Sequence, residues 1–108
     1  MKAKILSTSS EKSVGVIGRD SLDKDEIYIF LHIYPYTSFH MRNVVFPLEI
    51  AFLDQECGII DIKTMEPEEG NATAPSGTVY AVEASKDFYK SNNLKKGDFF
   101  KEVYNHIS

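Results

Sequence analysis

The sequence predicts an α+β domain that is mainly β: a small barrel-like sheet with mixed or antiparallel pairing and two short flanking helices. Three observations point to this class. The chain has 108 residues, enough for one domain (residues 1–108) with a single core. Several short segments alternate apolar and polar residues, or are rich in β-branched and aromatic residues. The segments that favour a helix are few and short.

The N-terminal third contains two predicted strands and one predicted helix. Lys2–Leu6 alternates and favours a first strand. The hydroxyls of Ser7–Ser10 can cap a helix that begins at Glu11 and reaches about Gly18. Glu26–Tyr34 (EIYIFLHIY) is the strongest strand in the chain, and both of its faces are apolar or aromatic. We therefore expect this strand at a central position in the sheet.

The middle of the chain predicts a β-hairpin over Leu48–Met65. Two alternating runs flank the Gly-containing connection Asp54–Gly58, which has hairpin length. We expect the side chains of four residues on these runs to be largely buried: Ile50, Phe52, Ile60 and Ile62.

The last third predicts one long loop, two strands and one helix. Glu66–Gly77 combines Pro, Gly and acidic residues and favours an exposed loop. Thr78–Ser85 favours a strand, and Ser85–Asn93 favours a helix capped by Ser85. In Lys95–Tyr104 we expect a left-handed Gly97 followed by a final strand.

Composition makes several classes of function poor candidates. The formal net charge is −4, from 12 basic and 16 acidic residues, so we expect no nucleic-acid partner. No segment approaches the ~18 continuous apolar residues of a membrane span. The single cysteine and three scattered histidines predict no disulfide, metal or cofactor. The N-terminus lacks a signal-peptide core, so we expect a cytoplasmic protein; an exported form that has lost its leader is the alternative.

Five short segments, in order, resemble a known family. They are Gly15–Arg19, Phe39–Asn43, Pro47–Asp54, Tyr80–Glu83 and Gly97–Asp98. This order resembles the DUF192 (UPF0127) family, whose molecular function is unknown. The resemblance implies a compact, mainly β, barrel-like domain with short flanking helices.

The first candidate site lies in the Phe39–Asn43 segment. If this segment is extended, Phe39 and Met41 enter the core while His40 and Arg42 share the opposite face. Arg42 can anchor an anion through its planar fork, and Asn43 suits the turn that follows. His40 can act as a base near neutral pH, but no nucleophile or metal motif accompanies it.

The second candidate site consists of polar residues within strands. Glu49 and Glu83 each interrupt an otherwise apolar strand, and a buried carboxylate needs a cation or hydrogen-bond donors. Arg19 and Arg42 are the only arginines, so the alternatives are structural ion pairs or a polar cluster lining a pocket. We expect a carboxylate, Glu49 or Glu83, to hold Arg42.

Three functions remain open from the sequence. The leading hypothesis is a binding module, a monomer or weak homodimer, for a small polar or anionic ligand or a peptide. Its candidate binding residues are Arg42, Asn43, Glu49, Glu83, Arg19, His40 and Tyr80. The first alternative is a small enzyme in which Glu49 or Glu83 is the acid/base and Arg42 stabilises negative charge. The second alternative is a structural protein-interaction domain.

Overall fold

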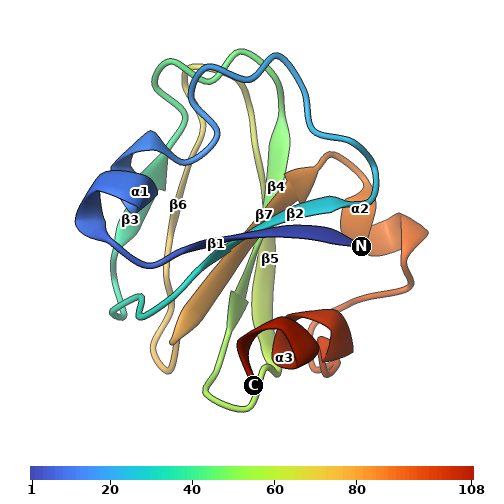
Figure 1. The fold of residues 1–108 in the computed structure, drawn as a ribbon. Coiled ribbons are helices and arrows are strands. Elements are labelled where there is room, and N and C mark those ends of the chain that lie inside the picture. The colour runs from blue at the N-terminus through green and yellow to red at the C-terminus, as the bar shows by residue number, and fades with distance from the viewer.

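The structure, a computed structural model that describes residues 1–108, is built on one five-stranded mixed sheet (Figure 1). Its strands, in sequence order, are β1 (Lys2–Leu6), β2 (Glu26–Phe30), β4 (Leu48–Leu53), β5 (Ile59–Met65) and β7 (Tyr80–Ser85). The spatial order is β1-β2-β7-β4-β5. β1 runs parallel to β2, and the other neighbours are antiparallel. β2 and β7 therefore lie inside the sheet, which confirms the central position expected for the strand predicted over Glu26–Tyr34. The strand is shorter than expected and ends at Phe30, because His32 adopts a positive φ that breaks the extended backbone.

The sheet is open, so the barrel-like part of the expected fold is not confirmed. β1 pairs only with β2 and β5 only with β4, which leaves both as edge strands. Closing a barrel requires the first and last strands to pair with a defined stagger. The mainly β character with short helices is observed.

The predicted hairpin is present as β4 and β5. Ile50 and Phe52 are fully buried, as expected. Ile60 and Ile62 are only half-buried, which corrects the prediction for β5. The pairing shifts by one residue between Phe52 and Leu53, and Ile59 and Met65 are the buried residues of this strand instead.

A two-stranded sheet corrects the prediction of a long exposed loop at Glu66–Gly77. β6 (Asn71–Thr73) lies inside that range and pairs antiparallel with β3 (Ser38–His40). Ala72 of β6 and Ala74, just after the strand, are buried. The Pro, Gly and acidic residues do mark turns in this range. The three-residue strand between them was missed because it forms by pairing with a strand about thirty residues earlier, and so short a strand shows no alternating pattern of its own.

Three short helices complete the fold: α1 (Ser9–Val14), α2 (Phe88–Ser91) and α3 (Lys101–Ile107). The expected hydroxyl cap of α1 is Thr8, which forms a capping box with Glu11, but the helix begins and ends earlier than the predicted range from Glu11 to about Gly18. The Ser85 cap expected for the helix over Ser85–Asn93 is wrong, because β7 continues through Ser85 and α2 begins only after Asp87. The final strand expected after Gly97 is wrong, because α3 stands in its place. Phe100, Val103 and Ile107 recur at helical spacing and pack toward the sheet.

The molecule has three layers, with the five-stranded sheet in the middle. One face of the sheet, here called the first face, carries α1 and the β3–β6 pair, and the second face carries α2 and α3 (Figure 1). None of the helices has the length and apolar character that a membrane-spanning helix requires.

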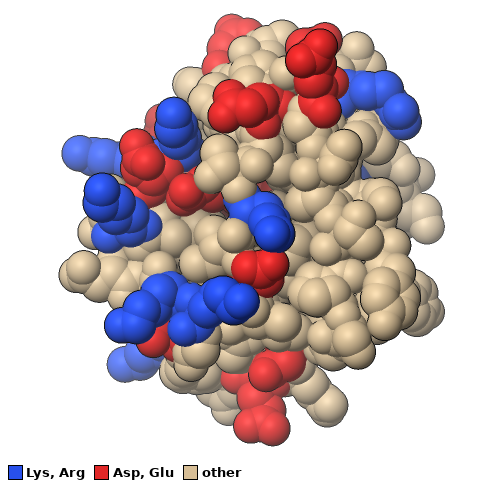
Figure 2. All heavy atoms as spheres, turned by 180° about the vertical axis from the view of Figure 1, so that it is seen from behind, with Lys and Arg blue, Asp and Glu red and all other residues tan.

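Charged side chains are mixed on the surface. Seen from behind, Lys and Arg are interspersed with Asp and Glu over the left side, the centre and the upper edge of the molecule, and the lower right of this view is uncharged (Figure 2). No continuous basic area is visible on this side.

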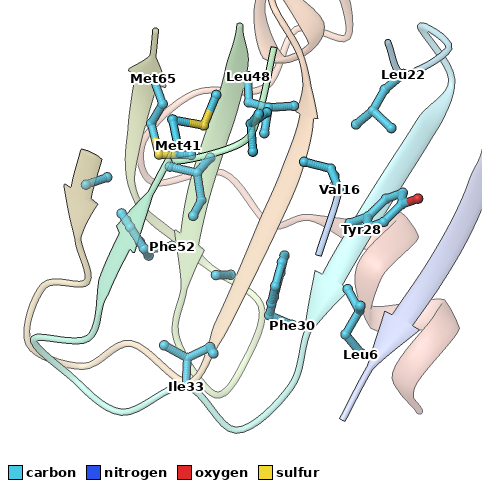
Figure 3. Packing of buried hydrophobic residues seen from close by; sticks show 14 of the residues in the cluster. Leu6, Val16, Leu22, Tyr28, Phe30, Ile33, Met41, Leu48, Phe52 and Met65 are labelled. Atoms are coloured by element: carbon cyan, nitrogen blue, oxygen red, sulfur yellow. The ribbon is translucent and has the colours of Figure 1, made fainter. Parts of the chain in front are cut away.

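The core on the first face positions the candidate site. Tyr28 and Phe30 of β2 point to the same side of the sheet as Phe52 of β4 (Figure 3). Val16 and Met41 cover them from the segments that follow α1 and β3. This layer is aliphatic and aromatic except at one strand position.

Candidate functional site

The exceptional position in this core is Glu83, in the interior strand β7. Strand pairing places Glu83 between Tyr28 of β2 and Ile50 of β4, so its side chain lies on the first face. Only 6% of the residue is exposed. A carboxyl group is thus set among side chains that cannot hydrate it.

Glu83 has no partner within the protein. No cation forms an ion pair with it, and burial is the one influence that acts on its protonation. Burial disfavours the charged form and raises the pKa of Glu83 from 4.5 to about 7. Every fully enclosed polar side-chain atom in the structure has a hydrogen-bond partner, so the unpaired oxygens of Glu83 must reach open space.

That space is a cavity of about 100 Å³ between the sheet and its cover. Its buried walls are Val16, Phe30, Met41 and Val44, with Phe39 half-buried beside them. The rings of Phe30 and Phe39 stand nearly perpendicular, 85° apart, with centroids separated by 5.5 Å. The pocket therefore combines aromatic and thioether surface with one carboxyl group.

The segment after the capping box forms one side of the pocket. Residues 12–17 all line the cavity. Gly15 ends α1 in the positive-φ region (φ 49°), where a side chain would strain the backbone. A Cβ atom there would also contact the Phe30 ring at 3.5 Å. Glycine thus allows the chain to turn at the end of α1 and to pass close to the Phe30 ring.

The polar residues Lys12, Ser13 and His40 line the cavity at its solvent side. Ser13 and His40 are exposed and Lys12 is half-buried. None of the three makes an ion pair. These side chains surround the mouth and leave the interior to the apolar walls and Glu83.

The two arginines lie outside this pocket. Arg19 donates from Nη1 and Nη2 to the two carboxylate oxygens of Glu26 at 2.8 and 2.9 Å, and from Nη1 to the Tyr28 hydroxyl at 3.0 Å. These hydrogen bonds, with Arg19 as the main cause, lower the pKa of Glu26. Arg19 thus connects the segment after α1 to β2 and has a structural role.

Arg42 does not make the expected contact with Glu49 or Glu83. It is exposed and forms no ion pair, so that prediction is wrong. Met41 beside it is buried and Phe39 packs against the core, as expected. Asn43 is exposed with φ 66°, which fits its expected place in a turn.

The remaining candidates lie on the second face of the sheet. Glu49 is half-buried there, and its Oε1 accepts a hydrogen bond from the backbone N–H of Tyr89 at 3.3 Å. Tyr80 packs against the core of the same face. The structure therefore separates Glu49 and Tyr80 from Glu83. Of the seven predicted site residues, it brings together only Glu83 and His40.

Sequence reasoning missed most of the pocket. A carboxylate within an apolar strand was the signal that identified Glu83. Lys12 and Val44 carry no such signal, because they reach the cavity only through contacts between distant segments. No group of His, Cys, Asp and Glu side chains large enough to hold a metal ion converges in the structure.

Two solved structures share this fold. A protein of unknown function from Novosphingobium aromaticivorans DSM 12444 is 28% identical, with a TM-score of 0.80 over 90% of this chain and 71% of that one. A protein described as a candidate transcription regulator, from Sinorhizobium meliloti 1021, is 19% identical, with a TM-score of 0.81 over 90% and 78%. The second likeness shows the fold alone. No curated protein is significantly similar to the sequence.

The sequence also matches a family. Residues 1–101 match DUF192, which is described as an uncharacterized ACR. The matched range includes all the residues that line the pocket, Glu83 among them. With the shared fold and the five ordered segments, it shows that the chain belongs to the DUF192 family.

Proposed function

We propose that this domain is a binding module for a small ligand, with Glu83 as the polar anchor at the base of the pocket. The observation that carries the proposal is a carboxyl group, 6% exposed and without a partner, facing a cavity with apolar walls. Burial of the Glu83 carboxyl group costs free energy, because it removes part of the water that would solvate the charged form. A ligand that donates a hydrogen bond to Glu83 removes that cost and gains apolar contact.

The pocket favours a ligand with a small apolar body and one donor group. Binding sites of this kind place a few polar groups among hydrophobic walls, so that the polar groups set the orientation. An apolar cavity of roughly 150 Å³ holds benzene. A cavity of about 100 Å³ suits a smaller group, either a free molecule or the end of a longer one.

The geometry supports an anionic ligand less than the sequence suggested. Arg42 and Asn43, the expected anion anchors, are exposed and do not line the pocket. The base of the pocket is itself an acid. A polar ligand that donates hydrogen bonds is therefore the better match.

A role in transcription has little support from the surface. The one neighbour with that description is 19% identical, and this chain has a net charge of −4. Its basic side chains are interspersed with acidic ones on the side shown in Figure 2. DNA binding normally depends on a clustered basic surface.

A fragment screen by amide chemical shifts tests the binding proposal. We expect small hydrogen-bond donors to shift the resonances of Gly15, Phe39, Met41 and Glu83 in a saturable way. Glu83→Gln should weaken these shifts by about tenfold or more, because it removes the charge and one acceptor site. Glu49→Gln is the matched control on the opposite face and should leave them unchanged. Saturable shifts that cluster elsewhere, or that survive in Glu83→Gln, would overturn the proposal.

An enzyme with Glu83 as its acid/base is the second candidate. The observation that favours it is the pKa of Glu83, about 7, which is suited to proton transfer near neutral pH. Neither arginine reaches the pocket, and Lys12 is the cation nearest its mouth. Incubation of a bound fragment with the protein, followed by mass spectrometry, separates the two functions. Turnover that is lost in Glu83→Gln favours the enzyme, and an unchanged fragment favours the binding module.

A further inference from the structure

We propose that the ligand group accepted beside Glu83 is a small organic ammonium cation, carried at the end of a short alkyl chain. This inference rests on the proposed binding function and names its ligand class. Three independent features of the pocket support it: an uncompensated acid, aromatic walls and a limited set of polar partners.

The protein itself supplies no counter-ion for the Glu83 carboxylate. Lys12 is the only basic side chain of Lys or Arg type that lines the cavity, and it forms no ion pair with Glu83. Arg19 is already engaged by Glu26 and Tyr28. A cation that enters the pocket is thus the group that gains most from the buried carboxylate, since opposite charges attract strongly at low dielectric.

The walls suit a cation with carbon substituents. Phe30 and Phe39 line the cavity together with Glu83, and their centroids are 5.5 Å apart. An ammonium group beside aromatic rings gains a cation–π interaction that increases when water is excluded. The thioether of Met41 adds a polarizable apolar surface on the same side.

The polar partners limit the number of N–H donors. Glu83 is the only buried polar side chain of the pocket, and Ser13 and His40 lie at its exposed mouth. A guanidinium group carries five N–H donors, most of which would stay unpaired inside. An alkylammonium group has three or fewer, and a methylated one has fewer still. The pocket therefore fits an amine better than an arginine-like group.

A titration with matched probes tests the ligand class. At about pH 8, isopropylammonium should shift the amide resonances of Gly15, Phe39 and Glu83 saturably. Isopropanol has the same carbon skeleton without the charge and should bind at least tenfold more weakly. Isobutyrate, an anion, should not bind. Equal or tighter binding of isopropanol, or no saturable shift with isopropylammonium, would overturn the inference.

Variants and pH locate the cation at Glu83. Glu83→Gln should abolish the preference for isopropylammonium over isopropanol, and Glu49→Gln should keep it. Because only the ionised carboxylate attracts the cation, wild-type affinity should fall roughly thirtyfold from about pH 8 to about pH 5.5. This pH series keeps the test valid even if Glu83→Gln folds poorly. A flat pH profile would contradict the inference.

Other charged or titratable groups line the pocket or pack around Glu83, and they need separate control. Lys12 of α1 and His40 of β3 line the mouth, Tyr28 lies next to Glu83 in the sheet, and Tyr89 packs behind β7 on the second face. His40→Gln removes the only imidazole among these side chains and is the control for a contribution from histidine. The pH dependence should persist in His40→Gln; its disappearance would assign the effect to His40 instead.

The outcomes separate the two proposals. If neutral donors bind in a Glu83-dependent way and isopropylammonium does not, the ammonium inference fails and the binding function stands. If neither class of probe shifts the pocket resonances, both fail.

Discussion

At the scale of single residues, Glu83 is the position where stability conflicts with the binding function that we propose. It stands among apolar side chains in the middle of an interior strand, and nothing in the protein compensates its charge. A group that weakens the fold in this way indicates a function, because structural roles are normally satisfied within the protein.

The stability of the protein should depend on the ionisation of Glu83. Its pKa rises from 4.5 to about 7 on folding, so the folded state binds the proton more tightly. The resulting stabilisation is complete below about pH 4.5 and is lost as the pH rises through 7. Wild type should lose up to about 3 kcal/mol over this range relative to Glu83→Gln. Urea unfolding of both proteins at several pH values measures the difference, and parallel curves would contradict a buried acid.

Truncation of the two arginines should affect the stability of the protein to different extents. Arg19→Ala removes three hydrogen bonds to Glu26 and Tyr28 and should lower the urea midpoint. Arg42→Ala removes an exposed side chain without an ion pair and should change the free energy of unfolding by no more than about 0.5 kcal/mol. Arg19→Lys should recover only part of the loss, because lysine lacks the planar fork. A greater loss of stability in Arg42→Ala than in Arg19→Ala would contradict the structural role assigned to Arg19.

At the scale of elements, the pocket depends on a helix of six residues. A helix as short as α1 is not stable by itself, and the capping box of Thr8 and Glu11 offsets this by pairing its free N–H groups. The backbone N–H groups of Thr8 and Ser7, which donate to the Glu11 carboxylate, lower the pKa of Glu11 to about 2. The chain then turns at Gly15 over Phe30 and continues as a wall of the pocket.

Loss of the cap should loosen that wall. Thr8→Ala removes the side-chain acceptor for the Glu11 N–H and should destabilise the protein by about 1 kcal/mol. Hydrogen exchange should accelerate at the Lys12 and Gly15 amides, whose bonds hold α1 together, and remain slow in β4 and β7. Thr8→Ser retains a hydroxyl and is the matched control. Uniform acceleration across the sheet would show that α1 does not open locally.

At the scale of the whole molecule, one sheet serves two cores. The core on the first face includes the pocket, and the core on the second face packs α2 and α3. Phe52 belongs to the first core, is fully buried and lies 5.8 Å from the ring of Phe39. The pocket wall and the centre of the fold are therefore in direct contact.

Truncation of Phe52 should affect both stability and the pocket. Phe52→Ala should cost about 3–5 kcal/mol, the usual range for a buried phenylalanine, because it leaves a cavity beside Phe39. Chemical denaturation measures this cost. Tyr34→Ala, at a position that is 78% exposed, should change stability by no more than about 0.5 kcal/mol. A loss below about 1 kcal/mol for Phe52→Ala would argue against a tightly packed core.

The sequence by itself determined the features that depend on neighbouring residues. The β4–β5 hairpin follows from two alternating runs around a Gly-containing turn, and the hydroxyl cap of α1 follows from the Ser and Thr residues before Glu11. Alternation also places Phe39 and Met41 toward the core, and Gly97 adopts the expected positive φ. Each is specified within a few residues, where side-chain period and turn chemistry act directly.

Only the tertiary structure decided which strand faces point the same way. Glu49 and Glu83 look equivalent in sequence, because each interrupts an apolar strand. Pairing of β4 with β7 sets Ile50 beside Glu83, which puts Glu49 on the other face. A shift of one residue would reverse this, since side chains alternate along a strand. Register, the β3–β6 pair and the pocket all depend on contacts between distant segments, and no local pattern encodes them.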